Sequence, residues 1–313
     1  MKVYSSPDTY TGNNTVVTIG MFDGVHIGHQ KLIDHVIEKA HELKGQSAIL
    51  TFWPHPRLVL DKGGDDLQFI TTLDEKTKII SQKGIEHLLL LPFSKELANM
   101  TAEEFIKEVL INKIGMTHLV VGYNHRFGKD RIHDFESYLT LSQKLGFSIS
   151  KVEAVAVQDE VISSTAIRQS LNRGLIEKAN RMLGYSFSIF GTVKGGQKLG
   201  RTLGYPTANI TPNEHYKLIP STGVYACWVD VMGRRYGGMM NLGIRPTVNK
   251  DKSATTIEVH ILDFNQDIYS EEIEIIFVKK IRDEQKFKGL DALKEQLKKD
   301  EGIIRSVLSE LTE

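Results

Sequence analysis

Apolar residues in the first half of the chain follow two alternating patterns. Short runs rich in β-branched residues or leucine are typical of buried strands, and they occupy residues 15–20, 47–52, 86–91, 118–121 and 147–152. Between them, apolar residues recur every three to four positions, most clearly in residues 30–43, as in a helix with one buried face. Strands that alternate with helices of this length predict a parallel, doubly wound α/β sheet.

The pattern changes after residue 184. Short β-rich segments separated by Gly, Pro, Asn and Asp turns predict an antiparallel barrel or sandwich, and they occupy residues 187–194, 223–231, 235–242, 255–262 and 271–278. Residues 289–313 are charged and amphipathic, which predicts a helix that packs on these strands. The sequence therefore predicts two domains, residues 1–184 of α/β class and residues 185–313 of β class with a C-terminal helix.

Composition and charge narrow the class of protein. The 313 residues include 39 Lys and Arg against 39 Asp and Glu, and this zero net charge disfavours a protein that binds nucleic acid mainly through phosphates. The single cysteine, Cys227, cannot form an internal disulfide or a cysteine-based zinc site. No stretch has the roughly 18 uninterrupted apolar residues of a membrane span, and residues 1–7 lack the apolar core of a signal peptide. We expect a cytoplasmic protein with neither nucleic-acid nor membrane partners.

A motif with two histidines lies between the first predicted strand and the first predicted helix. It stands at the carboxyl end of a parallel strand, where doubly wound sheets bind ligands. At a helix start, His26 and His29 project to one side, and Gly24 and Gly28 let a phosphate approach the backbone. Imidazoles there can stabilise the charge that develops on an α-phosphate as pyrophosphate leaves. The alternative is an ordinary turn with two surface histidines. A metal site is disfavoured, because no further ligand stands beside them at ligand spacing.

A second polar motif lies near the end of the α/β half. Ser163, Ser164 and Thr165 stand at a predicted helix start, and Arg168 follows one turn later. Hydroxyl groups and a guanidinium are suited to hold the β- and γ-phosphates of a nucleotide. An ordinary Ser/Thr N-cap followed by a solvated arginine is the alternative. The presence of the histidine motif in the same domain favours the nucleotide interpretation.

A glycine-rich segment opens the β half. Residues 195–202 nearly match the P-loop pattern, but Pro206 follows too closely for the helix that a P-loop needs. We interpret Gly195, Gly200 and Arg201 as part of a flap whose backbone can approach phosphates. Thr207 and Asn209 then alternate on one face of an extended segment and offer oxygen ligands suited to magnesium on a nucleotide. A polar β-edge is the alternative.

A carboxylate completes the second set of candidate residues. Glu258 alternates with Ile257 and Val259, so its side chain points away from theirs on a predicted strand. It can act as the base that accepts a proton from a hydroxyl in phosphoryl transfer. A solvated strand carboxylate is the alternative, and the pattern alone slightly favours it.

These motifs together resemble the bacterial bifunctional riboflavin kinase/FMN adenylyltransferases, also called FAD synthetases. The resemblance covers the whole chain and rests on residues 20–29, 163–168, 204–209 and 280–287. It implies an α/β nucleotidyltransferase domain followed by a riboflavin-kinase-like β-barrel. The implied substrates are ATP, riboflavin and FMN, with Mg²⁺ on the nucleotide.

The resemblance also implies roles for particular residues. In the kinase half, Thr207 and Asn209 would hold Mg-ATP and Glu258 would be the base. In the adenylyltransferase half, His26 and His29 would be catalytic phosphate-binding groups, and residues 163–168 would bind the pyrophosphate side of ATP.

Three further residues are candidates for flavin binding. Asn124 and Arg126 lie on the loop after the strand at residues 118–121, where Asn124 departs from the aspartate of many relatives. Arg282 either contacts flavin or packs on the barrel.

Three other functions compete with this interpretation. A nucleotidyltransferase for another phosphomonoester, with an accessory barrel, would not need Thr207, Asn209 and Glu258. A flavin carrier that has lost catalysis is expected to lack a histidine or the base, and His26, His29 and Glu258 are all present. A class I aminoacyl-tRNA synthetase shares the His-Ile-Gly-His string but needs further RNA-binding mass and a basic face. The sequence therefore favours a flavin-cofactor biosynthetic enzyme.

Overall fold

The structure, a computed structural model, describes residues 1–59, 68–123, 125–130, 134–157, 160–195, 200, 203–245 and 254–311. The chain divides into two compact units, Met1–Ser164 and Thr165–Glu313, and each is described by itself. In the described part of the chain, we find no helix with the length and apolar character needed to cross a membrane.

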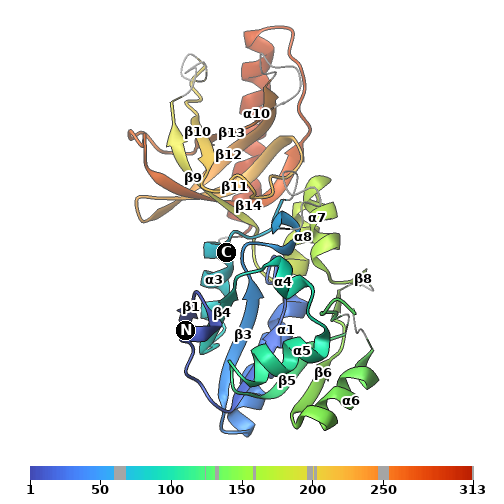
Figure 1. Cartoon of the computed structure of the whole chain (residues 1–313). Coiled ribbons are helices and arrows are strands. Elements are labelled where there is room, and N and C mark those ends of the chain that lie inside the picture. The colour runs from blue at the N-terminus through green and yellow to red at the C-terminus, as the bar shows by residue number, and fades with distance from the viewer. Residues whose placement is uncertain are drawn as a thin grey trace. The chain divides into compact units, whose positions relative to one another are not determined.

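The first unit is built on a six-stranded parallel sheet with the order β1-β4-β3-β2-β5-β6 (Figure 1). The strands are β1 (Lys2–Tyr4), β2 (Thr15–Ile19), β3 (Gln46–Phe52), β4 (His87–Leu91), β5 (Met116–Gly122) and β6 (Ser148–Val152). Five of these match the predicted strands within two residues at either end. The sequence pattern missed β1, a three-residue strand that pairs with β4 at the edge of the sheet.

Helices connect the parallel strands and cover both faces of the sheet. They are α1 (Ile27–Glu42), α2 (Pro56–Val59), α3 (Leu73–Gln82), α4 (Lys95–Ala98), α5 (Ala102–Phe105), continued by a π-helical turn over Ile106–Ile111, and α6 (Phe135–Leu145). A 3-10 turn (Pro7–Thr9) and a small hairpin of β7 (Ala156–Val157) and β8 (Glu160–Val161) complete the unit. A capping box of Thr101 and Glu104 begins α5.

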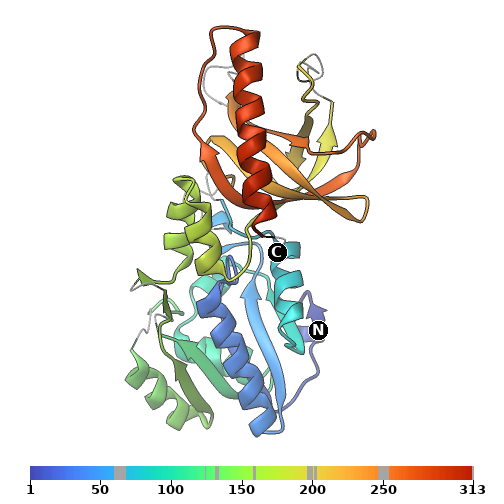
Figure 2. The ribbon, with the colours of Figure 1, turned by 180° about the vertical axis from the view of Figure 1, so that it is seen from behind.

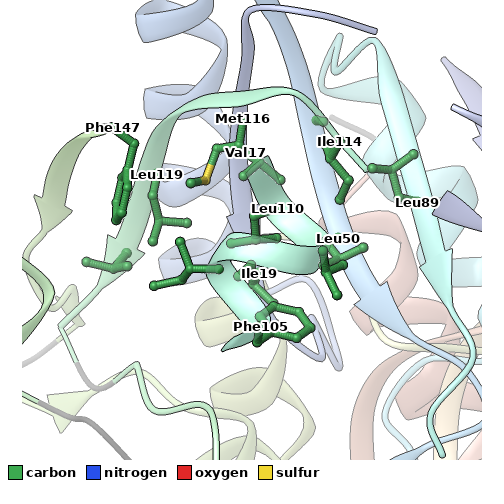
Figure 3. Packing of buried hydrophobic residues seen from close by; sticks show 14 of the residues in the cluster. Val17, Ile19, Leu50, Leu89, Phe105, Leu110, Ile114, Met116, Leu119 and Phe147 are labelled. Carbon is green, nitrogen blue, oxygen red and sulfur yellow. The ribbon is translucent and has the colours of Figure 1, made fainter. Parts of the chain in front are cut away.

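Alternate residues of the central strand pack into two different cores. Val17 and Ile19 of β2 belong to a cluster with Phe105 of α5 and Leu110 of the turn that follows it (Figure 3). Val16, from the same strand, belongs to a second cluster with residues of α1 and α3. Figure 2 shows α1 on the face of the sheet opposite to α5. A sheet buried on both faces confirms the predicted doubly wound α/β class.

The second unit begins with two helices and continues as a closed six-stranded barrel. The helices are α7 (Ser164–Asn172), whose first residue belongs to the first unit, and α8 (Ile176–Leu183). The strands are β9 (Ser188–Lys194), β10 (Ala208–Pro212), β11 (Gly223–Val231), β12 (Arg234–Arg245), β13 (Ala254–Ile261) and β14 (Glu272–Arg282). All neighbours are antiparallel, in the closed order β10-β13-β12-β11-β14-β9. The pairing of β9 with both β10 and β14 closes the barrel, which excludes an open sandwich.

The last helix covers part of the outside of the barrel. α10 (Leu290–Ser309) buries Ile304 and Leu308 against Val224, Ala226 and Met239. These strand residues alternate with Tyr225, Cys227 and Met240, which are buried and lie on the inner face of the barrel. Figure 2 shows α10, in red, along the outer wall. The predicted C-terminal helix is therefore confirmed, and residues on the same side as Val224 lie on the outer face.

Candidate active sites

The loop between β2 and α1, residues 20–26, has an unusual backbone. Phe22, Gly24 and Val25 have φ angles of 49°, 81° and 33°. This left-handed region is rarely occupied by residues with a side chain, and it costs about 1–3 kcal/mol at such a residue. The surroundings must therefore hold the β2–α1 loop in place, and the structure shows how they do.

Asp23 attaches this loop to the segment before α3. Its buried carboxylate accepts hydrogen bonds from the backbone N–H groups of Ile70 at 3.3 Å and Thr71 at 3.1 Å. The hydroxyl of Thr71 in turn accepts a hydrogen bond of 3.0 Å from the N–H of Gly24. The amide of Gly24, predicted to face a phosphate, is therefore engaged within the protein.

Two more side chains hold the loop through its carbonyl groups. Ser164 Oγ donates a hydrogen bond of 2.8 Å to the carbonyl oxygen of Asp23, which links the serine motif to the histidine motif. Lys76 Nζ on α3 donates one of 2.7 Å to the carbonyl oxygen of Met21. Ser164, a predicted phosphate-binding residue, therefore uses its hydroxyl to hold the β2–α1 loop in this structure.

The two histidines stack at the start of α1. His26 is the N-cap residue, and its Nδ1 accepts a hydrogen bond of 3.2 Å from the N–H of His29. The two imidazole rings are parallel within 13°, with centroids 3.6 Å apart. Because Nδ1 of His26 is an acceptor, its proton is assigned to Nε2, which can donate to a ligand. A side chain at Gly28 would crowd the His26 ring, since its Cβ would lie 3.2 Å away.

Both histidines are neutral in the free protein. Burial lowers the pKa of His26 to about 4. Burial, with a further contribution from the nearby Lys76 ammonium and from repulsion by the His26 ring whenever that ring is protonated, holds the pKa of His29 well below its ordinary value. Neither ring is therefore a cation at neutral pH. The positive charges near them are those of Lys76 and the helix end, and the carboxylate of Asp23 also lies near His26.

The remaining candidates of the first half are only partly described. Ser163 precedes α7, while Thr165 and Arg168 follow Ser164 along that helix as residues of the second unit. Asn124 lies outside the described residues, and Arg126 is exposed. Within this motif, the Ser164 side chain contacts the β2–α1 loop directly.

His125, beside these residues, packs in an aromatic cluster. Its ring centroid lies 5.4 Å from that of Phe127 and 6.0 Å from that of Tyr138. Burial lowers the pKa of His125 to about 4. This position therefore serves packing more than phosphate binding.

The second candidate site is a row of polar side chains across the outside of the barrel. Asn209 on β10 lies opposite Glu258 on β13 and opposite Lys194 on β9, and Asn241 on β12 lies opposite Glu258 from the other side. Residues directly opposite in antiparallel strands point to the same face. The row therefore joins four polar residues. It continues through Val224, which pairs with Asn241 and packs under α10.

Thr207 extends this row at the end of β10. Its Oγ1 donates a long hydrogen bond of 3.4 Å to Glu258 Oε2. The residue before Thr207 is also held by β13, because a ring nitrogen of His260 lies 2.8 Å from the carbonyl oxygen of Pro206. Thr207, Asn209 and Glu258 therefore lie together, as their predicted roles require.

The glycine-rich flap is described only at its ends. Gly195 lies at the end of β9 and is exposed, while residues 196–199 and Arg201 lie outside the described residues. Gly200 accepts a hydrogen bond of 2.8 Å from the N–H of Tyr205, and a Cβ at Gly200 would lie only 2.1 Å from the Tyr205 carbonyl oxygen. Only glycine therefore fits at position 200, which sets the approach to Thr207.

Arg282 is paired with the C-terminal helix. Its Nε and Nη2 donate hydrogen bonds to the fully buried carboxylate of Asp300, the latter at 2.8 Å, and Nη1 donates to the Asp283 carbonyl oxygen at 3.0 Å. This fork joins β14 to α10. Arg282 therefore packs between the barrel and α10, which is one of its two predicted roles. Its contact with flavin stays a prediction.

Sequence reasoning missed Lys76, Lys194 and Asn241. Asn241 alternates with the buried Met240 and Leu242, the same signal that singled out Glu258. Lys76 stands four residues before the buried Ile80, so a charged residue occupies the buried face of α3. The sequence signals of Asn241 and Lys76 are both present. A role for either residue can be inferred only when the structure shows which residues lie beside it.

Comparisons with known proteins assign a family to each half of the chain. Residues 9–166 match the family model of FAD synthetase, and residues 183–308 match that of riboflavin kinase. The bifunctional riboflavin kinase/FMN adenylyltransferase of Listeria monocytogenes is 37% identical over 97% of this chain and 96% of its own length. Its counterpart in Bacillus subtilis is 39% identical over 91% and 90%. A crystal structure from Streptococcus pneumoniae, titled a macrolide-efflux protein, has a TM-score of 0.89 at 32% identity and covers 97% of this chain and 98% of that one.

Proposed function

The chain belongs to the bifunctional riboflavin kinase/FMN adenylyltransferase family, and on that premise we propose that it makes FAD in two steps. The barrel transfers the γ-phosphate of ATP to the 5′-hydroxyl of riboflavin, giving FMN and ADP. The first unit transfers AMP from a second ATP to FMN, giving FAD and pyrophosphate. The observation that carries the proposal is the presence of two separate polar sites. One lies at His26 and His29, and the other at Asn209 and Glu258.

In the kinase step, a proton must leave the riboflavin hydroxyl. The hydroxyl oxygen forms a bond to the γ-phosphorus of ATP, and the bond from that phosphorus to the β–γ bridging oxygen breaks. ADP leaves with the bonding electrons. Glu258 takes the released proton, since its carboxylate lies on the outer face of the barrel beside Thr207 and Asn209. Asn241 lies opposite Glu258, and Lys194 lies opposite Asn209. Both side chains orient the substrates.

The residues beside Glu258 fit magnesium. The Thr207 hydroxyl and the side-chain amide oxygen of Asn209 are hard oxygen donors at neighbouring positions of one face. Thr207 and Asn209 would hold magnesium there, and the metal would stabilise the negative charge that develops on the nucleotide phosphates. Gly195, Gly200 and Arg201, at the flap, bind the phosphates of the same nucleotide.

In the adenylyl transfer, an oxygen of the FMN phosphate forms a bond to the α-phosphorus of ATP. The bond from that phosphorus to the α–β bridging oxygen breaks, and pyrophosphate leaves with the bonding electrons. The transfer itself neither takes up nor releases a proton. His26 and His29 bind the α-phosphate, with the Nε2–H of His26 donating to a developing negative oxygen. The free helix amides beside Gly28 act on the same group.

The other assignments of the adenylyltransferase site follow the family motifs. Ser163, Thr165 and Arg168 bind the β- and γ-phosphates, and Ser164 fixes the loop that carries Gly24. Arg126 and Asn124 contact the flavin. The partners are small molecules, and neither nucleic acid nor a membrane is required.

We place the domain boundary between residues 184 and 185. Gly184 ends α8 in a left-handed conformation, with φ of 78°, before the first barrel strand. We also assign the protein to the cytoplasm, because its single cysteine, Cys227, is buried and unpaired.

One incubation tests the two activities together. The protein is mixed with riboflavin and Mg-ATP, and the products are separated by chromatography at successive times. We expect FMN to appear first and FAD to follow, and FAD to form directly when FMN replaces riboflavin. FMN without FAD would overturn the adenylyltransferase assignment, and the absence of any turnover would favour a flavin carrier.

A further inference from the structure

A buried lysine lies beneath the β2–α1 loop. Lys76 on α3 is only 4% exposed, although burial of a lysine is unfavourable unless its ammonium group is compensated. Its Nζ donates a hydrogen bond of 2.7 Å to the Met21 carbonyl oxygen. This is the one acceptor that the described residues give to a group with three N–H donors. A residue needed only for packing at this position would be apolar, like Ile80 one turn later.

The environment of Lys76 links it to the stacked histidines. Met21 opens the segment in which Phe22 and Val25 hold positive φ angles. The hydrogen bond from Lys76 therefore acts at the start of a strained loop, while Asp23 and Ser164 act further along it. The histidines at the end of the loop are uncharged. Lys76 therefore supplies the positive charge close to them.

Because the site receives two highly charged phosphate substrates, a fixed cation under the loop has a clear use. Both FMN and ATP bring negative charge to the start of α1, and a buried charge acts there with little screening by water. We propose that Lys76 is a positioning residue for adenylyl transfer, which fixes the β2–α1 loop through Met21 and supplies positive charge behind the α-phosphate position. The inference rests on the proposed function of the first unit.

The groups that face Lys76 determine how it titrates. Asp23 on the loop favours the charged ammonium, and His29 on α1 lies within electrostatic range. On α3 itself, Glu75 is turned to the N–H of Thr72 in a capping box. Burial outweighs the carboxylate and lowers the pKa of Lys76 to about 8. The cation is therefore present at neutral pH and is lost as the pH rises through about 8.

The test measures FAD formation from FMN and Mg-ATP in the full chain. Lys76→Met is expected to lower kcat about 100-fold, the usual scale when reacting groups are displaced by about 1 Å. Lys76→Arg keeps a permanent charge and is expected to restore activity in part. Lys78→Met, at an exposed position of the same helix, serves as the matched control and is expected to match the wild type. Urea unfolding of each variant in a Trp228→Phe background, followed by Trp53 fluorescence, reports that the first unit is folded, and riboflavin kinase activity reports that the barrel is folded.

The pH dependence separates positioning by charge from simple packing. Wild-type FAD formation is expected to fall above about pH 8, and Lys76→Arg is expected to remove that fall. A Lys76→Met variant with wild-type kcat would overturn the inference. An alkaline limb that is identical in wild type and Lys76→Arg would also overturn it, even if Lys76→Met failed to fold. A wild-type protein that makes no FAD from FMN would instead contradict the proposed function.

Discussion

Asn209 on β10 and Glu258 on β13 lie directly opposite each other, so an amide and a carboxylate share one face of the barrel. Thr207, two residues before Asn209, reaches the same carboxylate with its hydroxyl at 3.4 Å. A candidate metal-nucleotide ligand and a candidate base are thereby within reach of one phosphoryl group. This relationship motivates the first prediction.

Glu258→Gln removes the proton acceptor but keeps the size of the side chain. We expect FMN formation from riboflavin to fall by at least about 100-fold, the usual contribution of a general base. FAD formation from supplied FMN should persist, because the first unit does not use this residue. Both rates are measured by chromatography. Equal loss of both activities in a folded protein would contradict the assignment.

His29→Ala is expected to have the opposite effect. The substitution removes one of the two stacked rings, which are 3.6 Å apart, and leaves His26 Nδ1 with its backbone donor. We expect FAD formation from FMN to fall by about 100-fold, because donors aimed at developing charge contribute on this scale. Riboflavin kinase activity serves as the internal control. Retention of the FAD-forming rate would exclude His29 from the site.

Gly200→Ala tests whether close backbone approach positions the kinase flap. The added Cβ would lie 2.1 Å from the Tyr205 carbonyl oxygen, so the segment leading to Thr207 must shift. We expect a higher KM for ATP in the kinase reaction and an unchanged rate of FAD formation from FMN. Gly302→Ala in α10, where a Cβ meets nothing within 4 Å, is the matched control. Equal KM values in the two variants would show that the flap tolerates the shift.

Acid should destabilise the first unit through its buried neutral histidines. The pKa values of His26 and His125 are about 4, below the ordinary value of about 6.5. Between these two values the unfolded chain binds more protons than the native one, so the free energy of unfolding falls as the pH falls. Each residue contributes at most about 3 kcal/mol to this loss.

His125→Phe provides a direct measurement of this effect. Phenylalanine keeps a ring in contact with Phe127 and Tyr138 and removes the titrating nitrogen atoms. Urea unfolding is followed by Trp53 fluorescence in a Trp228→Phe background, at about pH 7 and about pH 5. We expect a smaller drop between the two pH values for His125→Phe than for wild type. The exposed His215→Phe serves as control, and an equal drop in all three proteins would refute the explanation.

Local patterns in the sequence predicted the framework of both sites. Strand and helix periodicities placed His26 and His29 at the start of a helix after a buried strand, and α1 begins there. Alternation on a single strand was enough to separate Glu258 from the apolar side chains of Ile257 and Val259. These predictions succeeded because spacing, caps and alternation depend on residues close together in the chain.

Other features depended on the tertiary structure, since they join residues far apart in the sequence. The pairing of β9 with β10 and β14 closed the barrel and placed Lys194 opposite Asn209, and the pairing of β12 with β13 placed Asn241 opposite Glu258. Arg282 was a candidate ligand in the sequence, and folding paired it with Asp300. Burial made the two histidines neutral. Folding also brought Lys76 within hydrogen-bond distance of the β2–α1 loop. The sequence by itself determined which groups carry the chemistry, whereas the folded chain decided their charge and their partners, because both depend on burial and on neighbours that no local pattern encodes.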